Sequence, residues 1–345
     1  MGKPLCLLMA MDPRVAELSV YDLTISMVPA EIVGADLRHL ERRCVVQAYS
    51  LDATERPVDH LEQCFRGCHL VLVVAGVPNK DRTMTELLKI NANIAKSIVE
   101  ACGRFCPEAV VGIIVNPLNS VVPAMARLYE KKGLDPMKIC GVTTLDVVRA
   151  NKFVHEETGA PIENIDIPVV GGSGATSGAT ALPLFSQDRV ARKMPVPRQN
   201  ELLERVRNAG SEITAIKKGK GNAVLAMAYA AARFGKAVLS GLSGQRTVET
   251  AFVKQVDGPC PYFSSRVTFG RTGVEKVHKI GGKLSPHEKT SLGEVVELLK
   301  RDVQDGLDYA EKTDLCFNPA QAVHDSAGAY SNPPTAIAKS LGHRQ

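Results

Sequence analysis

Short apolar runs alternate with longer segments of helical period through the first half of the chain, and this alternation limits the possible folds most strongly. Strands are predicted at 17–22, 69–77, 110–115 and 165–170, where apolar or β-branched residues cluster. Helices are predicted at 84–103 and 144–158, where apolar residues recur every three or four positions. Strands that alternate with helices form βαβ units. The pattern therefore predicts an α/β fold class with a doubly wound parallel sheet.

The second half of the chain has a different pattern. It contains a long helical stretch at 199–237, strand-like segments at 251–252 and 262–268, and a final helix from 286 to about 312. This order is typical of an α+β domain. At roughly 150 residues per domain, a chain of 345 residues suggests two domains. We expect them at 1–145 and 146–314, followed by a flexible C-terminal tail at 315–345 that is rich in Ala, Ser, Pro and Gly.

Composition and charge exclude several classes of protein. Hydrophobic residues make up 45% and charged residues 23%, values that are ordinary for globular proteins. The net charge of +5 is not concentrated in any stretch, and no apolar run approaches the ~20 residues that cross a bilayer. We therefore expect no nucleic-acid partner and no membrane partner. The nine cysteines lack CxxC pairs, so we expect no metal and a reducing intracellular compartment, either cytoplasmic or mitochondrial.

The N-terminal segment contains part of a dinucleotide-binding unit. Such a unit has a strand, a glycine-rich turn, a helix, and an acidic residue about 20 residues later. Gly2 precedes a helical run with Pro4 in its first turn, and Asp22 ends the next strand at the expected distance. Asp22 is a candidate ligand of the ribose hydroxyls, and the alternative is a solvated strand cap. The preceding strand and the other glycines are absent from this chain, so we expect weak dinucleotide binding.

Asn116 directly follows the predicted strand at 110–115. Ligands bind at strand ends in open α/β sheets, and an Asn amide offers both a donor and an acceptor. Asn116 is therefore a candidate ligand of a bound carbonyl or amide. A turn-forming Asn before Pro117 is the alternative.

Asp146 and Arg149 lie three residues apart on one face of the predicted helix at 144–158. An acid that orients a base, beside an Arg that binds a carboxylate, would suit this arrangement. A plain surface ion pair explains the same spacing.

Seven segments, in order along the chain, resemble malate dehydrogenases of the mitochondrial and bacterial type, in the lactate/malate dehydrogenase family. They are VYD at 20–22, AGVP at 75–78, NPLNS at 116–120, GVTTLDVVRANKFV at 141–154, VVGG at 169–172, LAMAYAAARF at 225–234 and CPYFSS at 260–265. The resemblance implies a Rossmann-type NAD-binding domain and a C-terminal α+β lactate/malate dehydrogenase domain. It also implies a homodimer that reversibly converts malate and NAD to oxaloacetate and NADH.

The resemblance implies a role for individual residues as well. The cofactor contacts would be Gly2, Asp22, Asn91, Val115, Asn116 and Met227. Asn116 and Arg149 would bind a small dicarboxylate such as malate or oxaloacetate, with Arg149 pairing with a carboxylate. Asp146 would orient the catalytic histidine of the family.

The chain departs from the family pattern at two substrate-binding arginines and at the catalytic histidine. Asn79 replaces the arginine that follows AGVP in the family, Met84 or Thr85 lies near the place of the second arginine, and Arg82 is a possible substitute nearby. Ser173 occupies the position of the catalytic histidine after the glycine pair, or Thr176 does when the duplicated SGAT is aligned from its other end. A serine hydroxyl does not accept a proton at neutral pH as an imidazole does, so the contribution of a general base, about 10² to 10⁴ in rate, would be lost.

These observations give three functional hypotheses. The first is an NAD-dependent malate dehydrogenase. The second is a catalytically impaired paralogue that acts as a binding or regulatory subunit, which the replaced histidine and arginine favour. The third is a 2-hydroxy acid dehydrogenase of altered specificity, which the missing arginine favours and the missing histidine opposes.

Overall fold

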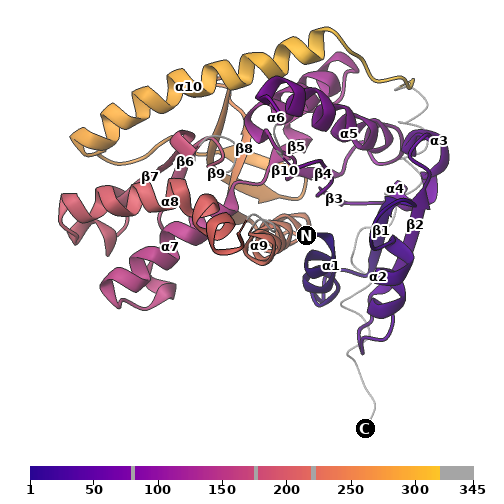
Figure 1. Ribbon diagram of the computed structural model, residues 1–345, viewed down its shortest axis with the longest axis horizontal. Coiled ribbons are helices and arrows are strands. Elements are labelled where there is room, and N and C mark those ends of the chain that lie inside the picture. The colour runs from indigo at the N-terminus through magenta and orange to yellow at the C-terminus, as the bar shows by residue number, and fades with distance from the viewer. Residues whose placement is uncertain (79–81, 175–177, 219–222, 319–345) are drawn as a thin grey trace.

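The computed structural model describes residues 1–78, 82–174, 178–218 and 223–318 (Figure 1). The elements up to residue 141 are α1 (Gly2–Ala10), β1 (Glu17–Leu23), α2 (Ala30–Leu37), β2 (Val45–Leu51), α3 (Pro57–His60), α4 (Glu62–Phe65), β3 (Leu70–Val73), α5 (Met84–Phe105), β4 (Val110–Ile113), α6 (Leu118–Lys131), η1 (Pro136–Lys138) and β5 (Ile139–Gly141). The later elements are α7 (Thr144–Thr158), η2 (Ile162–Asn164), β6 (Val169–Gly171), η3 (Gly178–Thr180), β7 (Ala181–Pro183), η4 (Phe185–Gln187), η5 (Ala191–Lys193), α8 (Val196–Ile216), α9 (Val224–Leu242), β8 (Thr247–Lys254), β9 (Tyr262–Gly270), β10 (Gly273–Val277) and α10 (Pro286–Glu311).

The strands form one large mixed sheet and one small sheet. In the large sheet β3, β4 and β5 are parallel, and the antiparallel strands follow in the order β8, β9, β6 and β7, with β10 beside β9. The two parts meet where Gly141 of β5 pairs with Phe252 of β8. In the described residues β1 and β2 form a separate parallel pair. The predicted α/β half and α+β half are confirmed, and the structure adds that they share a sheet.

Helices cover both faces of the large sheet (Figure 1). On one face, Leu118 of α6 lies against Gly141 of β5. On the other face, Phe234 of α9 packs edge-on against Phe269 of β9, with ring centroids 5.5 Å apart. All four residues of β4 are buried. A strand covered on both sides is expected to be a continuous apolar run, as 110–115 is.

Most predicted elements are confirmed. The strands predicted at 17–22, 69–77 and 110–115 correspond to β1, β3 and β4, and the helices predicted at 84–103, 144–158 and 286 to about 312 correspond to α5, α7 and α10. The strand predicted at 165–170 is wrong, because β6 begins only at Val169. The side chains of Asn151 and Asp188 accept the backbone N–H groups of Ile167 and Asp166, which are therefore unavailable to a neighbouring strand. Ile165 and Ile167 are buried nonetheless, which explains the apolar pattern without a strand.

The single helical stretch predicted at 199–237 is also wrong. The chain forms two helices there, α8 and α9, and α8 is followed by Lys218 with a φ of +49°. That backbone conformation does not continue a right-handed helix. The strand predicted at 251–252 is the centre of the longer β8. Residues 319–345 of the predicted tail lie outside the described residues.

All nine cysteines are free thiols. Five are buried, namely Cys64, Cys102, Cys106, Cys140 and Cys260, and Cys316 is exposed. Burial raises the pKa of the Cys140 thiol to about 12. The described residues contain no group of His, Cys, Asp and Glu side chains suited to a metal ion. None of the described helices has the length and apolarity of a membrane span.

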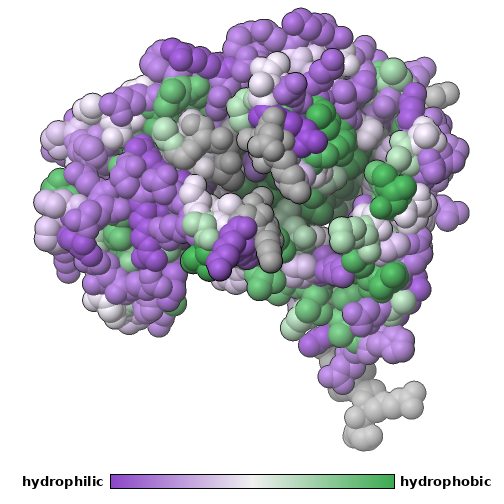
Figure 2. Space-filling model, viewed as in Figure 1, coloured by the Kyte–Doolittle hydropathy of each residue, from purple (hydrophilic) through white to green (hydrophobic). Residues whose placement is uncertain are grey.

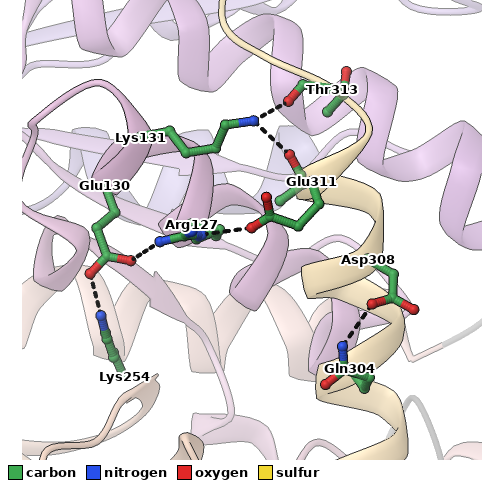
Figure 3. Close-up of polar contacts among 9 residues, drawn as sticks. Arg127, Glu130, Lys131, Lys254, Gln304, Asp308, Glu311 and Thr313 are labelled. Carbon is green, nitrogen blue, oxygen red and sulfur yellow. Dashed lines mark hydrogen bonds and ion pairs between the residues drawn. The ribbon is translucent and has the colours of Figure 1, made fainter.

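Helix α10 is joined to α6 by polar contacts along its C-terminal half (Figure 3). Arg127 of α6 donates to Glu311 of α10 at 2.9 Å and to Glu130 at 3.2 Å. The Nζ of Lys131 donates to the carbonyl oxygen of Thr313 at 2.8 Å. Such exposed ion pairs contribute little stability one by one, so closer contacts must hold the two helices together.

The closest contact between these helices lies at Gly306 of α10. A Cβ atom built on Gly306 would lie 2.0 Å from the carbonyl oxygen of Ser120 in α6. No side chain can occupy that space without moving one of the helices. Glycine at position 306 therefore sets the distance between α10 and α6.

We predict that Gly306→Ala lowers the free energy of unfolding by about 1–3 kcal/mol, because the added methyl overpacks a backbone contact. The measurement is a urea titration of each purified variant. Gly293→Ala is the matched control on the same helix, since a Cβ at Gly293 meets nothing within 4 Å. Alanine there should be neutral or stabilise by up to about 1 kcal/mol. Equal effects of the two substitutions would contradict the assigned contact.

Candidate active site

The loops after β3 and β4 are tied together by the side chain of Asn91 from α5. Its Oδ1 accepts the N–H of Val77 at 2.8 Å, and its Nδ2 donates to the carbonyl oxygens of Val77 at 3.1 Å and Asn116 at 2.6 Å. Asn91 is buried. Its side chain therefore holds the two strand ends in one arrangement and leaves the side chain of Asn116 exposed at the edge of the sheet.

Gly76 lies in the first of these loops with a φ of +132°, a region that favours glycine. A Cβ at this position would lie 3.2 Å from Oδ1 of Asn91 and 3.3 Å from Cγ1 of Val115. Val115 is buried. The backbone at Gly76 thus passes directly over Asn91 of α5 and over Val115, which follows β4.

Helix α7 carries Asp146 and Arg149, as predicted. Nη1 of Arg149 lies 3.8 Å from Oδ1 of Asp146, and the two side chains are only 10% and 4% exposed. Burial raises the pKa of Asp146, while an N–H from Gly174 and the charge of Arg149 oppose that rise. Burial also disfavours the charged form of Arg149, and it therefore lowers the pKa of Arg149. The surface ion pair proposed as an alternative is excluded by this burial.

Several N–H donors of the Arg149 guanidinium are available to a ligand. In the parts of the chain that the structure describes, it makes the loose ion pair with Asp146 and donates no hydrogen bond. A planar guanidinium has five N–H donors, which match the two oxygens of a carboxylate. Arg149 is therefore suited to bind an anionic ligand.

The loop after β6 lies against α7 and α6. Ser173 is buried, and its N–H donates to Oδ1 of Asn119 at 2.8 Å. The next N–H, from Gly174, donates to Oδ2 of Asp146 at 3.0 Å. The Asp146 carboxylate thus holds backbone at the place where the resemblance puts a histidine. Thr176 lies outside the described residues.

Asn119 contacts the loop of this site, a role that no sequence pattern predicted. It has no exposed surface, and its Nδ2 donates to Oγ1 of Thr180 at 3.2 Å and to Oδ2 of Asp302 at 2.9 Å. The only sequence signal was its place in NPLNS, three residues after Asn116 and in the first turn of α6. Its partners are distant in the sequence, so spacing could not reveal them.

The remaining predicted residues are exposed or lie outside the described residues. Arg82 is exposed and donates from Nη1 to the carbonyl oxygen of Pro78 at 3.1 Å. Asn79 lies outside the described residues. Asp22 is exposed at the end of β1, and its Oδ1 accepts the N–H of Leu23 at 2.8 Å.

The start of α1 lies close to the end of β3, since a Cβ on Gly2 would come within 3.9 Å of Cγ2 of Val74. Met227 of α9 packs against the cluster that α1 forms with Leu70 and Leu72 of β3. Figure 2 shows a hollow lined partly by hydrophobic side chains near the middle of this face, where Figure 1 places the N-terminus and β3. The first-turn N–H groups of a helix bind anions, so a nucleotide phosphate fits this position.

Models of two protein domains match the chain. Residues 1–141 match the lactate/malate dehydrogenase NAD binding domain, and residues 143–310 match the lactate/malate dehydrogenase alpha/beta C-terminal domain.

The chain is similar to known proteins along most of its length. It is 40% identical over 312 residues to mitochondrial malate dehydrogenase of Chlamydomonas reinhardtii, covering 90% of this chain and 80% of that protein. It is 39% identical over 313 residues to mitochondrial malate dehydrogenase of Sus scrofa, covering 90% and 88%. The solved apo malate dehydrogenase of Picrophilus torridus shares the fold with a TM-score of 0.76 at 21% identity, over 90% of this chain and 96% of that one. The chain belongs to the lactate/malate dehydrogenase family.

Proposed function

We propose that this chain is an NAD-dependent malate dehydrogenase that reversibly converts malate and NAD to oxaloacetate and NADH. The observation that carries the proposal is the buried guanidinium of Arg149, which donates no hydrogen bond within the described ranges. A carboxylate of the substrate would supply the missing acceptors. The similarity to mitochondrial malate dehydrogenases supports the same substrate class.

We place the cofactor and the substrate in different parts of the chain. Residues 1–145 would form the NAD-binding domain and 146–314 the substrate and dimerisation domain, a division that the two matched domain models support. Asp22 would bind the ribose hydroxyls, and the N–H groups after Gly2 would face the phosphates. Val115, Asn116 and Met227 would line the nicotinamide side, and Asn91 would hold that wall in place. NAD, when bound, accepts the hydride from the hydroxyl-bearing carbon of malate.

The substrate would lie between Asn116 and Arg149. Arg149 would hold one carboxylate, and the amide of Asn116 would donate to the oxygen that changes between hydroxyl and carbonyl. The second carboxylate needs another cation or donor, for which Asn79 and Arg82 are the candidates. Arg82 is exposed, so its guanidinium is available to a ligand.

The proton of the malate hydroxyl needs an acceptor. Ser173 occupies the place of the family's base, and its hydroxyl cannot take up that proton at neutral pH. The carboxylate of Asp146 already accepts the N–H of Gly174. We therefore expect slow chemistry in an intact pocket. The comparisons give no support to the alternative of a non-catalytic subunit. The assay below tests that alternative directly.

Oxaloacetate reduction at saturating NADH is expected to be measurable, and Arg149→Gln should lower kcat/KM on the order of 10²- to 10⁴-fold. The loss should appear in the KM for oxaloacetate and leave the KM for NADH unchanged, because Arg149 would contact only the substrate. Lys152→Gln is the matched control, since Lys152 lies on the same helix, is exposed and pairs with Glu156. A wild-type rate equal to the protein-free blank would refute the proposed activity and favour the non-catalytic subunit.

We predict that Ser173→His raises the rate of oxaloacetate reduction less than about tenfold. The arginine that would polarise the substrate carbonyl is still replaced by Asn79, and about 1 Å of misplacement of the base can cost on the order of 10²-fold. The same initial-rate assay would be run on Ser173→Ala as the control for lost hydroxyl. A gain of 10²-fold or more would mean that the loop already presents residue 173 correctly.

We also propose a homodimer. Helix α1 contacts both α2 and α9, and these three helices carry exposed apolar side chains, namely Ile32 at 59%, Leu7 at 41%, Leu225 at 74% and Tyr229 at 54% exposure. Clusters of exposed apolar residues of this kind mark protein interfaces. The nine free thiols support a reducing compartment, and the names of the relatives suggest the mitochondrion.

Sedimentation velocity at tens of micromolar should show a dimer, and Ile32→Glu should weaken its association at least about tenfold, because a charge would be buried in the interface. Val256→Glu is the control, since Val256 is 96% exposed in the loop between β8 and β9 and belongs to none of the three helices. A wild-type monomer, or equal weakening by both variants, would contradict the proposed interface.

A further inference from the structure

We infer that Asn119 and Asp302 form a positioning pair, which fixes the loop at residues 173 and 174 from outside the substrate pocket. Asn119 is fully buried, so we expect it to act on the loop and to touch no ligand. Its kinetic consequence rests on the proposed function, whereas its effect on the loop does not.

Every polar atom of the Asn119 side chain has a partner. Oδ1 accepts the N–H of Ser173 at 2.8 Å, and Nδ2 donates to Oγ1 of Thr180 at 3.2 Å and Oδ2 of Asp302 at 2.9 Å. Thr180 in turn donates to the carbonyl oxygen of Ser173 at 3.1 Å. Both backbone groups of Ser173 are therefore held through one amide.

The loop lies so close to this amide that the contact depends on glycine at position 172. A Cβ on Gly172 would lie 2.7 Å from Oδ1 and 2.8 Å from Nδ2 of Asn119. The position of the amide therefore sets the position of the loop. Asn119 controls the N–H of residue 173, and Asp146 controls the N–H of residue 174.

Asp302 gives the amide its orientation. An Asn side chain can rotate by half a turn and exchange its oxygen and nitrogen, and the donors and acceptors around it decide which arrangement holds. The carboxylate of Asp302 can only accept, so it requires nitrogen on its side and leaves oxygen for Ser173. Burial raises the pKa of Asp302, helped by Asp305, and the bond from Asn119 opposes the rise.

The test compares Asn119→Ala, Asn119→Asp and the exchange variant Asn119→Asp with Asp302→Asn, all in the full chain. Hydrogen exchange at the amides of residues 173 and 174 should become roughly tenfold faster in Asn119→Ala. Asn119→Asp should do the same or more, because two carboxylates would then face each other. The exchange variant should regain most of the protection, because an amide at 302 again donates to an acceptor at 119.

The kinetic measurement separates an effect on the loop from an effect on NADH binding. In oxaloacetate reduction, Asn119→Ala should lower kcat/KM for oxaloacetate about tenfold, because the loop also contacts Asp146 beside Arg149, and should leave the KM for NADH within about twofold. Asn151→Ala is the matched control, since Asn151 is also buried and its Oδ1 accepts a backbone N–H, that of Ile167, at 3.0 Å. It should reduce thermal stability and leave exchange at 173 and 174 unchanged.

Each outcome decides one question. Unchanged exchange at 173 and 174 in Asn119→Ala, or the same faster exchange in Asn151→Ala, would overturn the positioning pair. Failure of the exchange variant to regain protection would overturn the role of Asp302. A wild-type protein without turnover that still shows the predicted exchange pattern would refute the proposed function and leave the pair standing.

Discussion

The contact of Gly306 with the Ser120 carbonyl oxygen determines more than the packing of two helices. Asp302 lies four residues before Gly306, on the same face of α10, and Asn119 directly precedes Ser120. The close approach of the helices therefore brings Asp302 to Asn119, and Asn119 reaches the loop after β6. A glycine in the C-terminal helix thus helps to determine the position of the loop that contacts Asp146 of α7.

The pairing of Asp146 with Arg149 is costly for a protein that uses it only for stability. Two charges that are nearly removed from water, 3.8 Å apart and without a hydrogen bond between them, lose more hydration than their attraction returns. Hydrophobic residues of similar volume would pack at least as well. The presence of Asp146 and Arg149 on one buried face is better explained by a charged ligand that binds to Arg149.

Much of the fold could be predicted from periodicity, because α5, α7 and α10 are long and amphipathic and β4 is buried on both faces. The strand at 165–170 was wrongly predicted because buried side chains, here Ile165 and Ile167, do not require a paired backbone. The strands β5 and β7 have only three residues each, too few for a period to be visible.

The candidate site divides in a similar way. The spacing of Asp146 and Arg149 on one helix predicted that the two side chains lie together. It did not predict that they are buried. Asn119, Thr180 and Asp302 come from segments separated by 61 and 183 residues along the chain, so only the fold brings them into contact. Asn116 was predicted from its place after the strand at 110–115, and Asn91 was predicted from the resemblance. The hydrogen bond from Asn91 of α5 to the Asn116 carbonyl oxygen became visible only in three dimensions.

The distribution of the thiols has a practical consequence. Burial raises the pKa of Cys6 to about 11 and of Cys68 to about 12, so these groups are poor nucleophiles at neutral pH. Cys316 is the exposed cysteine, and its N–H donates to Glu100 of α5 just beyond the end of α10. A maleimide dye or a nitroxide would therefore attach first at that position in the unaltered chain. Its signal would follow the docking of α10, and with it the contact at Gly306 on which the pocket depends.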